Sequence, residues 1–459
     1  MPGPCRHYRL LSLRVLTAAW LLPLAGCATY HPVPLGEGDA VLAAPNADIL
    51  QTEASKIDRP WLEPVAINLD RPLDSNAVAV LAVLNNPDLK AQRVRVGVTD
   101  AQAFAARLLP DPTFSFSFDH LISGPDQLDN IAGQIAQDIG LIRDRKVIAQ
   151  QNRAKMQQVR LDLAWAEWQT AAAARLQLVR VLALEEQVGL NRASSAGAQA
   201  LLDASLKASL RGDIAADPVQ ANRLSALDAA DRLRTSEAAL VAARGELARL
   251  LGLPPGAQLR LVSSDPANVP LDPAHLFVIA QHRRTDLQAL RAGYDAEEAA
   301  VHKAVLDQFP TLAIGLGGNR DSTGNSLLST SVSFTLPLWN RNRGGIAIEK
   351  ATRTALKADY DARLAQTRSD IATAIAGIAI ARAAVEELGH QIPALEQYAA
   401  GARRAASRGD LSMAAASLAE QTLRDRRAQL SAARQTLGEQ MIALELVTGA
   451  PIATWGHEQ

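Results

Sequence analysis

The residue types in this sequence that could bind a metal ion or a phosphate are three histidines and a group of glycines. His275, His282 and His302 fall in two predicted helices, with no cysteine or group of carboxylates beside them to complete a zinc site. Gly315 and its neighbours lie in a strand-like segment and not in the strand–turn–helix loop that binds phosphate. No nucleophile or general-base motif accompanies them. The sequence therefore predicts no enzyme, no metal site and no cofactor.

A single cysteine, Cys27, stands where a chemical modification is expected. Three arginines precede the apolar and small-residue run of residues 15–26, which is too short to span a bilayer as a helix but fits a secretory signal. The run ends in Leu-Ala-Gly-Cys, the pattern of a bacterial lipobox. We therefore predict a lipoprotein signal peptide over residues 1–26 and lipidation of Cys27. Residue 28 is alanine and not aspartate, which resembles the pattern of lipoproteins sorted to the outer membrane.

Two Arg-Gly-Asp triplets interrupt long helical patterns, Arg211-Gly212-Asp213 and Arg408-Gly409-Asp410. Glycine permits a reversal of the chain, and aspartate can cap the helix that follows. A role as turn and cap alone would account for both triplets. The alternative is that their charges pair between neighbouring hairpin tips.

The two triplets belong to a duplication of the whole chain. Four landmarks recur in the same order at a separation of about 200 residues. They are Asn86-Pro87-Asp88-Leu89 and Arg284-Thr285-Asp286-Leu287, Pro110 and Pro310, the two triplets, and Leu251-Gly252-Leu253-Pro254 and Thr448-Gly449-Ala450-Pro451. The chain is therefore predicted to contain two copies of one large unit.

Each copy is expected to carry short helices, two strands and a long helical hairpin. The first repeat, 74–270, has strands at 113–120 and 130–141 and a hairpin at 143–252; the second, 271–452, has strands at 311–320 and 328–339 and a hairpin at 344–448. A helix of some 65 residues would be on the order of 100 Å long, which suits a coiled coil and not a compact domain. Residues 27–73 are expected to form an extended tether, and residues 453–459 a tail. The predicted class is mainly α with four strands.

The strands have the pattern of a membrane-spanning sheet. From Thr113 to His120, phenylalanine alternates with serine or aspartate, over about the length that a tilted strand needs to cross a bilayer. Four antiparallel strands cannot close, and open edges are not tolerated in lipid. Either several chains pool their strands, or the strands form a small soluble sheet. The formal net charge of −1 and the lack of a basic block argue against nucleic-acid binding.

Because these motifs occur in this order and in both copies, the sequence resembles the TolC-type outer-membrane efflux proteins. The resemblance rests on the motifs at residues 86–89 and 284–287, each of which precedes a predicted helix. It also rests on Phe309-Pro310-Thr311 before a strand and on Leu336-Pro337-Leu338-Trp339-Asn340 after one. Thr285 departs from the pattern, because many relatives carry proline there.

The resemblance implies a homotrimer whose chains build a 12-stranded transmembrane β-barrel on a helical tunnel. The protein would be the exit duct of a tripartite export machine in the outer membrane of a Gram-negative bacterium, lipid-anchored and mostly periplasmic. Its partners would be outer-membrane lipids, a periplasmic adaptor and, through the adaptor, an inner-membrane transporter. The triplets at 211–213 and 408–410 would dock the adaptor and gate the duct. The alternative is a lipid-anchored periplasmic coiled-coil scaffold or adaptor protein without a pore.

Overall fold

The computed structural model describes residues 30–35, 45–126, 128–263 and 270–455, apart from the side chain of Leu141. Residues 45–459 form one compact unit, and residues 1–44 form a separate one in which only the exposed residues 30–35 are described. The predicted signal peptide and Cys27 lie outside the described residues.

Helices dominate this unit and follow the predicted order twice. Their bounds are α3 Ala47–Ser55, α4 Ser75–Asn85, α5 Pro87–Ala105, α6 Gly140–Leu210, α7 Ala216–Leu250, α8 Pro273–Arg283, α9 Thr285–Leu306, α10 Arg343–Arg408 and α11 Met413–Thr448. Helix α6 has 71 residues and is therefore about 105 Å long. None of the described helices is both long and apolar enough to span a membrane.

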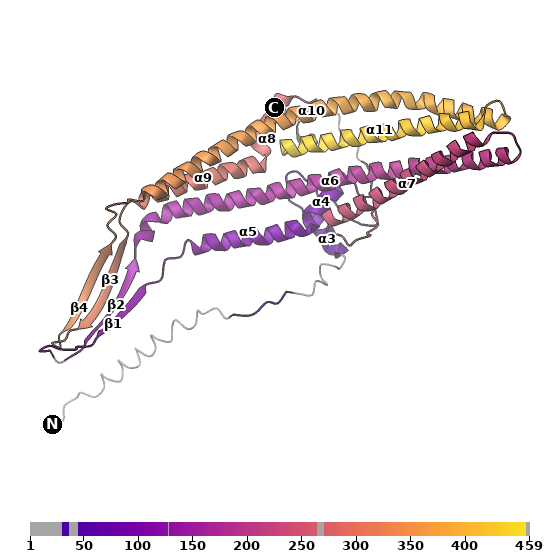
Figure 1. Ribbon diagram of the computed structural model, residues 1–459. Helices are drawn as coiled ribbons and strands as arrows, with labels where there is room; N and C mark the ends of the chain where they lie inside the picture. Colours follow the sequence, from indigo (N-terminus) through magenta and orange to yellow (C-terminus); the bar gives the residue numbers. More distant parts are fainter. Residues whose placement is uncertain (1–29, 36–44, 127, 264–269, 456–459) are drawn as a thin grey trace. The chain divides into compact units, whose positions relative to one another are not determined.

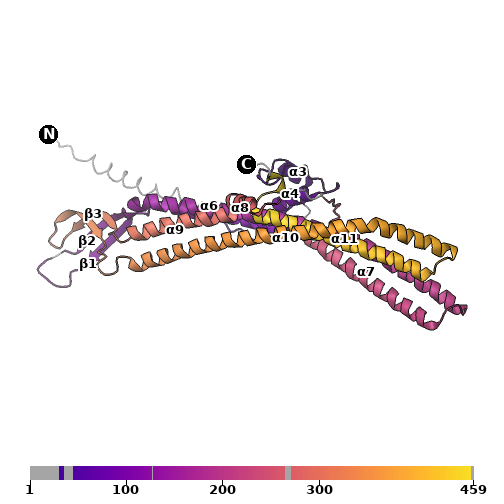
Figure 2. The same ribbon diagram turned by 90° about the horizontal axis from the view of Figure 1, so that it is seen from above.

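Four strands form one antiparallel sheet in the order β1-β2-β3-β4. They are β1 Thr113–Asp119, β2 Asn130–Asp138, β3 Leu312–Arg320 and β4 Ser326–Phe334. The mainly α fold with four strands per chain is thus confirmed. In both views the sheet lies at one end of the helices, and the α6–α7 and α10–α11 turns lie at the other (Figures 1 and 2).

The last predicted strand, 328–339, is displaced in the structure. Strand β4 ends at Phe334, because Pro337 has no N–H to donate to a ladder and because Arg341 and Asn342 adopt left-handed backbone angles before α10. The strand predicted to reach 141 ends at Asp138, since α6 already begins at Gly140. At both junctions the strand ends earlier than the alternation of apolar and polar residues predicts.

The expected tether over residues 27–73 is wrong for its described part. Residues 45–73 carry helix α3 and bury apolar side chains in one core with α4, α6 and α7; these are Leu50, Ala54, Ile57, Leu62, Ile67 and Leu73. Arg59 Nε also bonds Glu167 Oε2 on α6 at 2.6 Å. An irregular chain packs its apolar residues without a helical or strand period, so the sequence carries no signal of this docking.

The expected tail over 453–459 is also wrong where it is described. Trp455 is only 4% exposed, and its indole Nε1 donates to Ala450 O at 3.2 Å. The side chain completes a second core, built by α8, α10 and α11, that corresponds to the α4–α6–α7 core of the first repeat.

The landmarks that reveal the duplication touch one another within each copy. In the first, Asn85 Nδ2 donates to Leu251 O and Gly252 O at 2.9 and 2.8 Å. A Cβ on Gly252 would lie 2.3 Å from Asn85 O, so only glycine permits this approach. In the second, Arg284 Nη1 donates to Val447 O at 3.1 Å, and Gly449 packs on the Arg284 backbone. Each repeat is therefore tied where its short helices meet the end of its return helix.

Candidate functional site

One face of the sheet is apolar and exposed. Phe114, Phe116 and Phe118 on β1 are 68, 62 and 54% exposed. The strand register aligns them with the apolar positions of the other three strands. The face comprises Phe114, Phe116, Phe118, Ile131, Ile135, Leu312, Ile314, Leu316, Leu328, Val332 and Phe334. An aqueous surface of this size and composition would be costly, whereas a hydrocarbon environment suits it.

The opposite face of the same sheet carries small and polar residues. Its small and polar residues are Ser115, Ser117, Ala132, Gln134, Ala136, Ala313, Gly315, Gly317, Ser329, Ser331 and Ser333, and Leu327 near the start of β4 is its one large apolar residue among the paired positions. Gln134 Nε2 donates to Ser331 Oγ across Gly315, where a Cβ would collide with both groups. Gly315 thus serves this polar bridge, in keeping with the prediction that the glycine cluster is not a phosphate loop.

The sheet is open at both sides. Strands β1 and β4 each pair with only one neighbour, so each presents an unpaired row of backbone N–H and C=O groups. Such edges must be covered if the apolar face lies in lipid, because nothing there can hydrogen-bond to them. A single chain does not cover them within its described residues.

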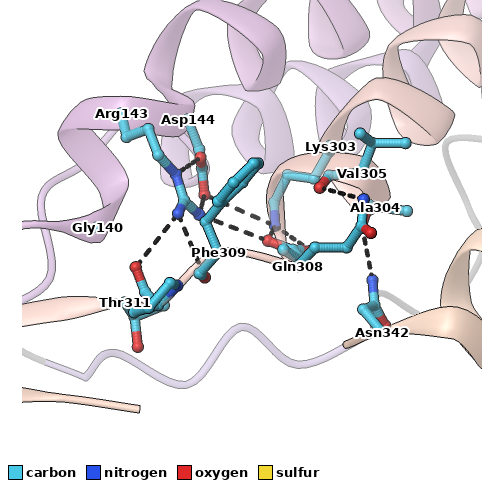
Figure 3. A network of polar contacts seen from close by, with 12 residues as sticks. Gly140, Arg143, Asp144, Lys303, Ala304, Val305, Gln308, Phe309, Thr311 and Asn342 are labelled. Carbon is cyan, nitrogen blue, oxygen red and sulfur yellow. Dashed lines mark hydrogen bonds and ion pairs between the residues drawn. The ribbon is translucent and has the colours of Figure 1, made fainter. Parts of the chain in front are cut away.

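A polar network joins the two repeats where helices meet the sheet (Figure 3). Arg143 at the start of α6 bonds Asp144 at 2.6 Å and donates through Nη1 to the backbone oxygens of Phe309 and Pro310 at 3.4 and 3.3 Å. The hydrogen bond from Arg143 is the main cause that lowers the pKa of Asp144. Asn342, before α10, donates to Ala304 O at 2.9 Å. The network fixes the ends of three long helices beneath the strands.

The two predicted tips are exposed turns at the far ends of the hairpins. Gly212 and Gly409 take φ angles of +79° and +83°, so glycine permits both reversals. Arg211 Nε bonds Asp213 Oδ2 at 2.8 Å, and Arg408 Nε bonds Asp410 Oδ2 at 2.9 Å. In the described chain each arginine thus pairs with the aspartate of its own triplet.

The expectation that the aspartates cap the following helices is wrong. The N-cap positions are occupied by Ala215, without a side-chain bond, and by Ser412, whose side chain accepts from Ala415 N at 3.1 Å. The ion pairs hold Asp213 and Asp410 instead.

The sequence did not reveal several interacting glutamates, because their partners lie far from them along the chain. Glu167, nearly inaccessible on α6, binds both Arg59 and Arg93. Glu297 on α9 lies against Glu349 on α10; burial first, and then the hydrogen bond with Glu349, raises its pKa to about 7. The spacing of residues along the sequence predicts neither of these contacts.

Within the described residues, no group of three or more His, Cys, Asp or Glu side chains could hold a metal ion.

Trp168 on α6 is a buried contact between the two repeats. It packs edge-on against Trp61 with ring centroids 4.9 Å apart, and its indole Nε1 donates to Leu446 O of the second repeat at 3.3 Å.

Known proteins share both sequence and fold with this chain. Residues 276–450 match the family of outer membrane efflux proteins. The cobalt-zinc-cadmium resistance protein CzcC of Cupriavidus metallidurans is 24% identical over 370 residues, which cover 80% of this chain and 86% of CzcC.

Solved structures share the fold over both repeats. The outer membrane protein VceC of Vibrio cholerae superposes with a TM-score of 0.67 at 15% identity, covering 82% of this chain and 96% of VceC. The outer membrane channel CmeC of Campylobacter jejuni gives 0.69 at 13% identity, covering 92% and 94%. Residues 276–450 thus match the outer membrane efflux protein family, and the chain shares over both repeats the fold of solved outer-membrane proteins.

Proposed function

We propose that the protein is the outer-membrane exit duct of a tripartite efflux system. The observation that carries the proposal is the two-faced sheet, apolar on one side and small and polar on the other, above helical hairpins about 100 Å long. Its open β1 and β4 edges support assembly as a homotrimer, in which three sheets join into a 12-stranded barrel. The apolar face would meet lipid and the serine-rich face would line the lumen.

A conductance measurement tests this function. Purified protein is added to planar lipid bilayers, and its mass in detergent is measured in parallel. We expect particles of trimer mass that open stable ion-conducting pores. Monomers without conductance would instead support the alternative, a lipid-anchored periplasmic scaffold, in which the exposed phenylalanines would have no use.

The partners and the anchor belong to the same proposal. A periplasmic adaptor would dock at the tips formed by residues 211–213 and 408–410 and link the duct to an inner-membrane transporter. Acylation of Cys27 would hold the chain in the outer membrane, with most of its mass in the periplasm.

The cargo is set by the transporter rather than by a wide passive duct. The name of CzcC, a cobalt-zinc-cadmium resistance protein, makes divalent metal ions the first cargo to test. The measurement is metal tolerance of cells with and without this gene, beside tolerance of hydrophobic drugs as the comparison. A deletion that sensitises cells to drugs but not to metals would contradict a metal cargo.

A further inference from the structure

A basic cleft lies between the end of α5 and the first turns of α6. It has a volume of about 290 Å³ and is lined by Ala106, Arg107, Arg145, Ile148, Ala149 and Arg153. Three arginines thus line a small cavity together with three apolar residues, and no carboxylate is among its lining residues. Ligand pockets begin near 300 Å³, so the space suits a small polar head and not a large solute.

The three arginines have no counter-charge of their own. Within the described part of the chain, the side chains of Arg107, Arg145 and Arg153 make no hydrogen bond or ion pair, and all three residues are exposed. Like charges gathered in this way repel one another, and a bound anion would relieve the repulsion. Planar guanidinium groups bind phosphate oxygens in pairs, which makes phosphate the anion of best fit.

The second repeat carries an acidic residue at the position of Arg107. The separation of 200 residues that aligns Pro110 with Pro310 places Asp307 at that position. Asp307 bonds Lys303 on its own helix at 2.9 Å and lies 3.9 Å from Arg143 of the first repeat. Asp307 is therefore paired, whereas Arg107 has no partner among the described residues.

The position of the cleft favours a lipid over a free anion. Arg107 lies between α5 and β1, and Arg145 and Arg153 lie about 8 and 20 Å from the start of α6, which is beside the sheet (Figure 1). The headgroup layer of a bilayer extends roughly 5–8 Å beyond the hydrocarbon, so Arg107 and Arg145 are the two arginines of the cleft closest to it along the chain. Four apolar residues next to this junction in the sequence are exposed: Phe104, Leu108, Leu109 and Ile142.

We propose that this cleft binds the phosphate headgroup of an anionic phospholipid of the periplasmic leaflet. Arg107 and Arg145, the two arginines nearest the sheet, would hold the phosphate, Arg153 would add positive charge farther along α6, and the acyl chains would run along the apolar side chains toward the sheet. The proposal rests on the proposed function, because it needs the sheet to lie in the membrane.

Native mass spectrometry of the full-length protein in detergent tests the assignment. The probes are dioleoyl phosphatidylglycerol, dioleoyl phosphatidylcholine and, in a separate thermal-shift arm, inorganic phosphate. The variant is R107Q/R145Q/R153Q; the control is R223Q/R232Q/R434Q, which removes three exposed arginines whose side chains also have no partner among the described residues. We expect phosphatidylglycerol retention to fall about tenfold or more in the cleft variant and to stay unchanged in the control.

Four results would overturn the proposal. They are equal retention of the two lipids by the unaltered protein, an equal loss in the control variant, stabilisation by inorganic phosphate as strong as by phosphatidylglycerol, and dissociation of the cleft variant into monomers, which would make the cleft a subunit interface. Trimer mass and conductance of the unaltered protein are recorded in the same preparation. A failure of the duct hypothesis is thereby seen separately from a failure of the lipid site.

Discussion

At the scale of single residues, Glu297 is the group whose ionisation should matter most. Burial and the hydrogen bond shared with Glu349 raise its pKa to about 7 from an ordinary value of 4.5, and its Oε1 is buried without a hydrogen-bond partner among the described residues. Between these two pH values the folded chain keeps a proton that the unfolded chain has lost. The free energy of unfolding therefore falls as pH rises through this window.

The variant Glu297→Gln should remove this dependence. An amide keeps the shape of the carboxyl and can donate to Glu349 at every pH, so the thermal midpoint should change less between pH 5 and pH 7.5. Glu298→Gln is the matched control, because the neighbouring Glu298 bonds Arg353 at 3.0 Å instead. An unaltered pH dependence in Glu297→Gln, measured by circular dichroism in detergent, would contradict the assignment.

Cys27 is the second residue whose chemistry can be tested alone. Cys27→Ser should abolish incorporation of labelled palmitate and slow cleavage of the signal, since the sulfur atom of this cysteine is where the lipid attaches. Cys5→Ser is the control, because Cys5 lies in the predicted signal peptide and should leave labelling intact. Labelling that persists in Cys27→Ser would show that the lipobox prediction is wrong.

At the scale of elements, the turns between the long helices should set the closed state of the duct. We expect Arg408→Ala with Asp410→Ala to raise the open fraction in single-channel recordings. An exposed ion pair contributes about 0.2–1 kcal/mol, so the change should be at most about fivefold. Arg234→Ala with Asp231→Ala removes a similar exposed pair from the middle of α7 and should change nothing. Unchanged closure and unchanged adaptor binding in the tip variant would refute the gating role.

A buried hydroxyl group at the start of α9 could be replaced to stabilise the fold. Thr285 occupies the first helical position, where Pro87 stands in the first repeat, and its hydroxyl is buried without a partner among the described residues. The preceding Arg284 already has an extended backbone, φ −65° and ψ 114°, which a following proline requires. Thr285→Pro should therefore stabilise the fold by about 0.4–1 kcal/mol.

A thermal melt in detergent checks this prediction. Thr285→Val separates the two contributions, because it removes the hydroxyl without restricting the backbone. A lower midpoint for Thr285→Pro than for the unaltered protein would mean that the turn before α9 differs from the one described.

At the scale of the whole molecule, the two faces of the sheet should respond oppositely to charge. Phe116→Arg places a cation at the middle of β1 on the apolar face and should cost about 2–4 kcal/mol if that face meets hydrocarbon at the bilayer midplane. Ser117→Arg, the next residue, points to the opposite face and should be tolerated. The readout is the amount of heat-resistant trimer in the outer-membrane fraction. Equal losses in both variants would argue against a lipid-facing sheet.

The sequence alone determined the elements of this protein and their order. Alternation at Phe114, Phe116 and Phe118 predicts a strand, and periodic apolar residues predict the hairpins, because both patterns depend on neighbours at most four positions apart. The glycines at 212 and 409 mark the turns for the same local reason. The duplicated landmarks add that the unit occurs twice.

Only the tertiary structure decided what joins these elements. It docks residues 45–73 onto α6 through the Arg59–Glu167 pair, it bonds Trp168 to Leu446 across the two repeats, and it brings Arg107 beside the first turns of α6. These contacts join residues about 40 to 280 positions apart. Their geometry depends on the path of the whole chain, and no local spacing records it.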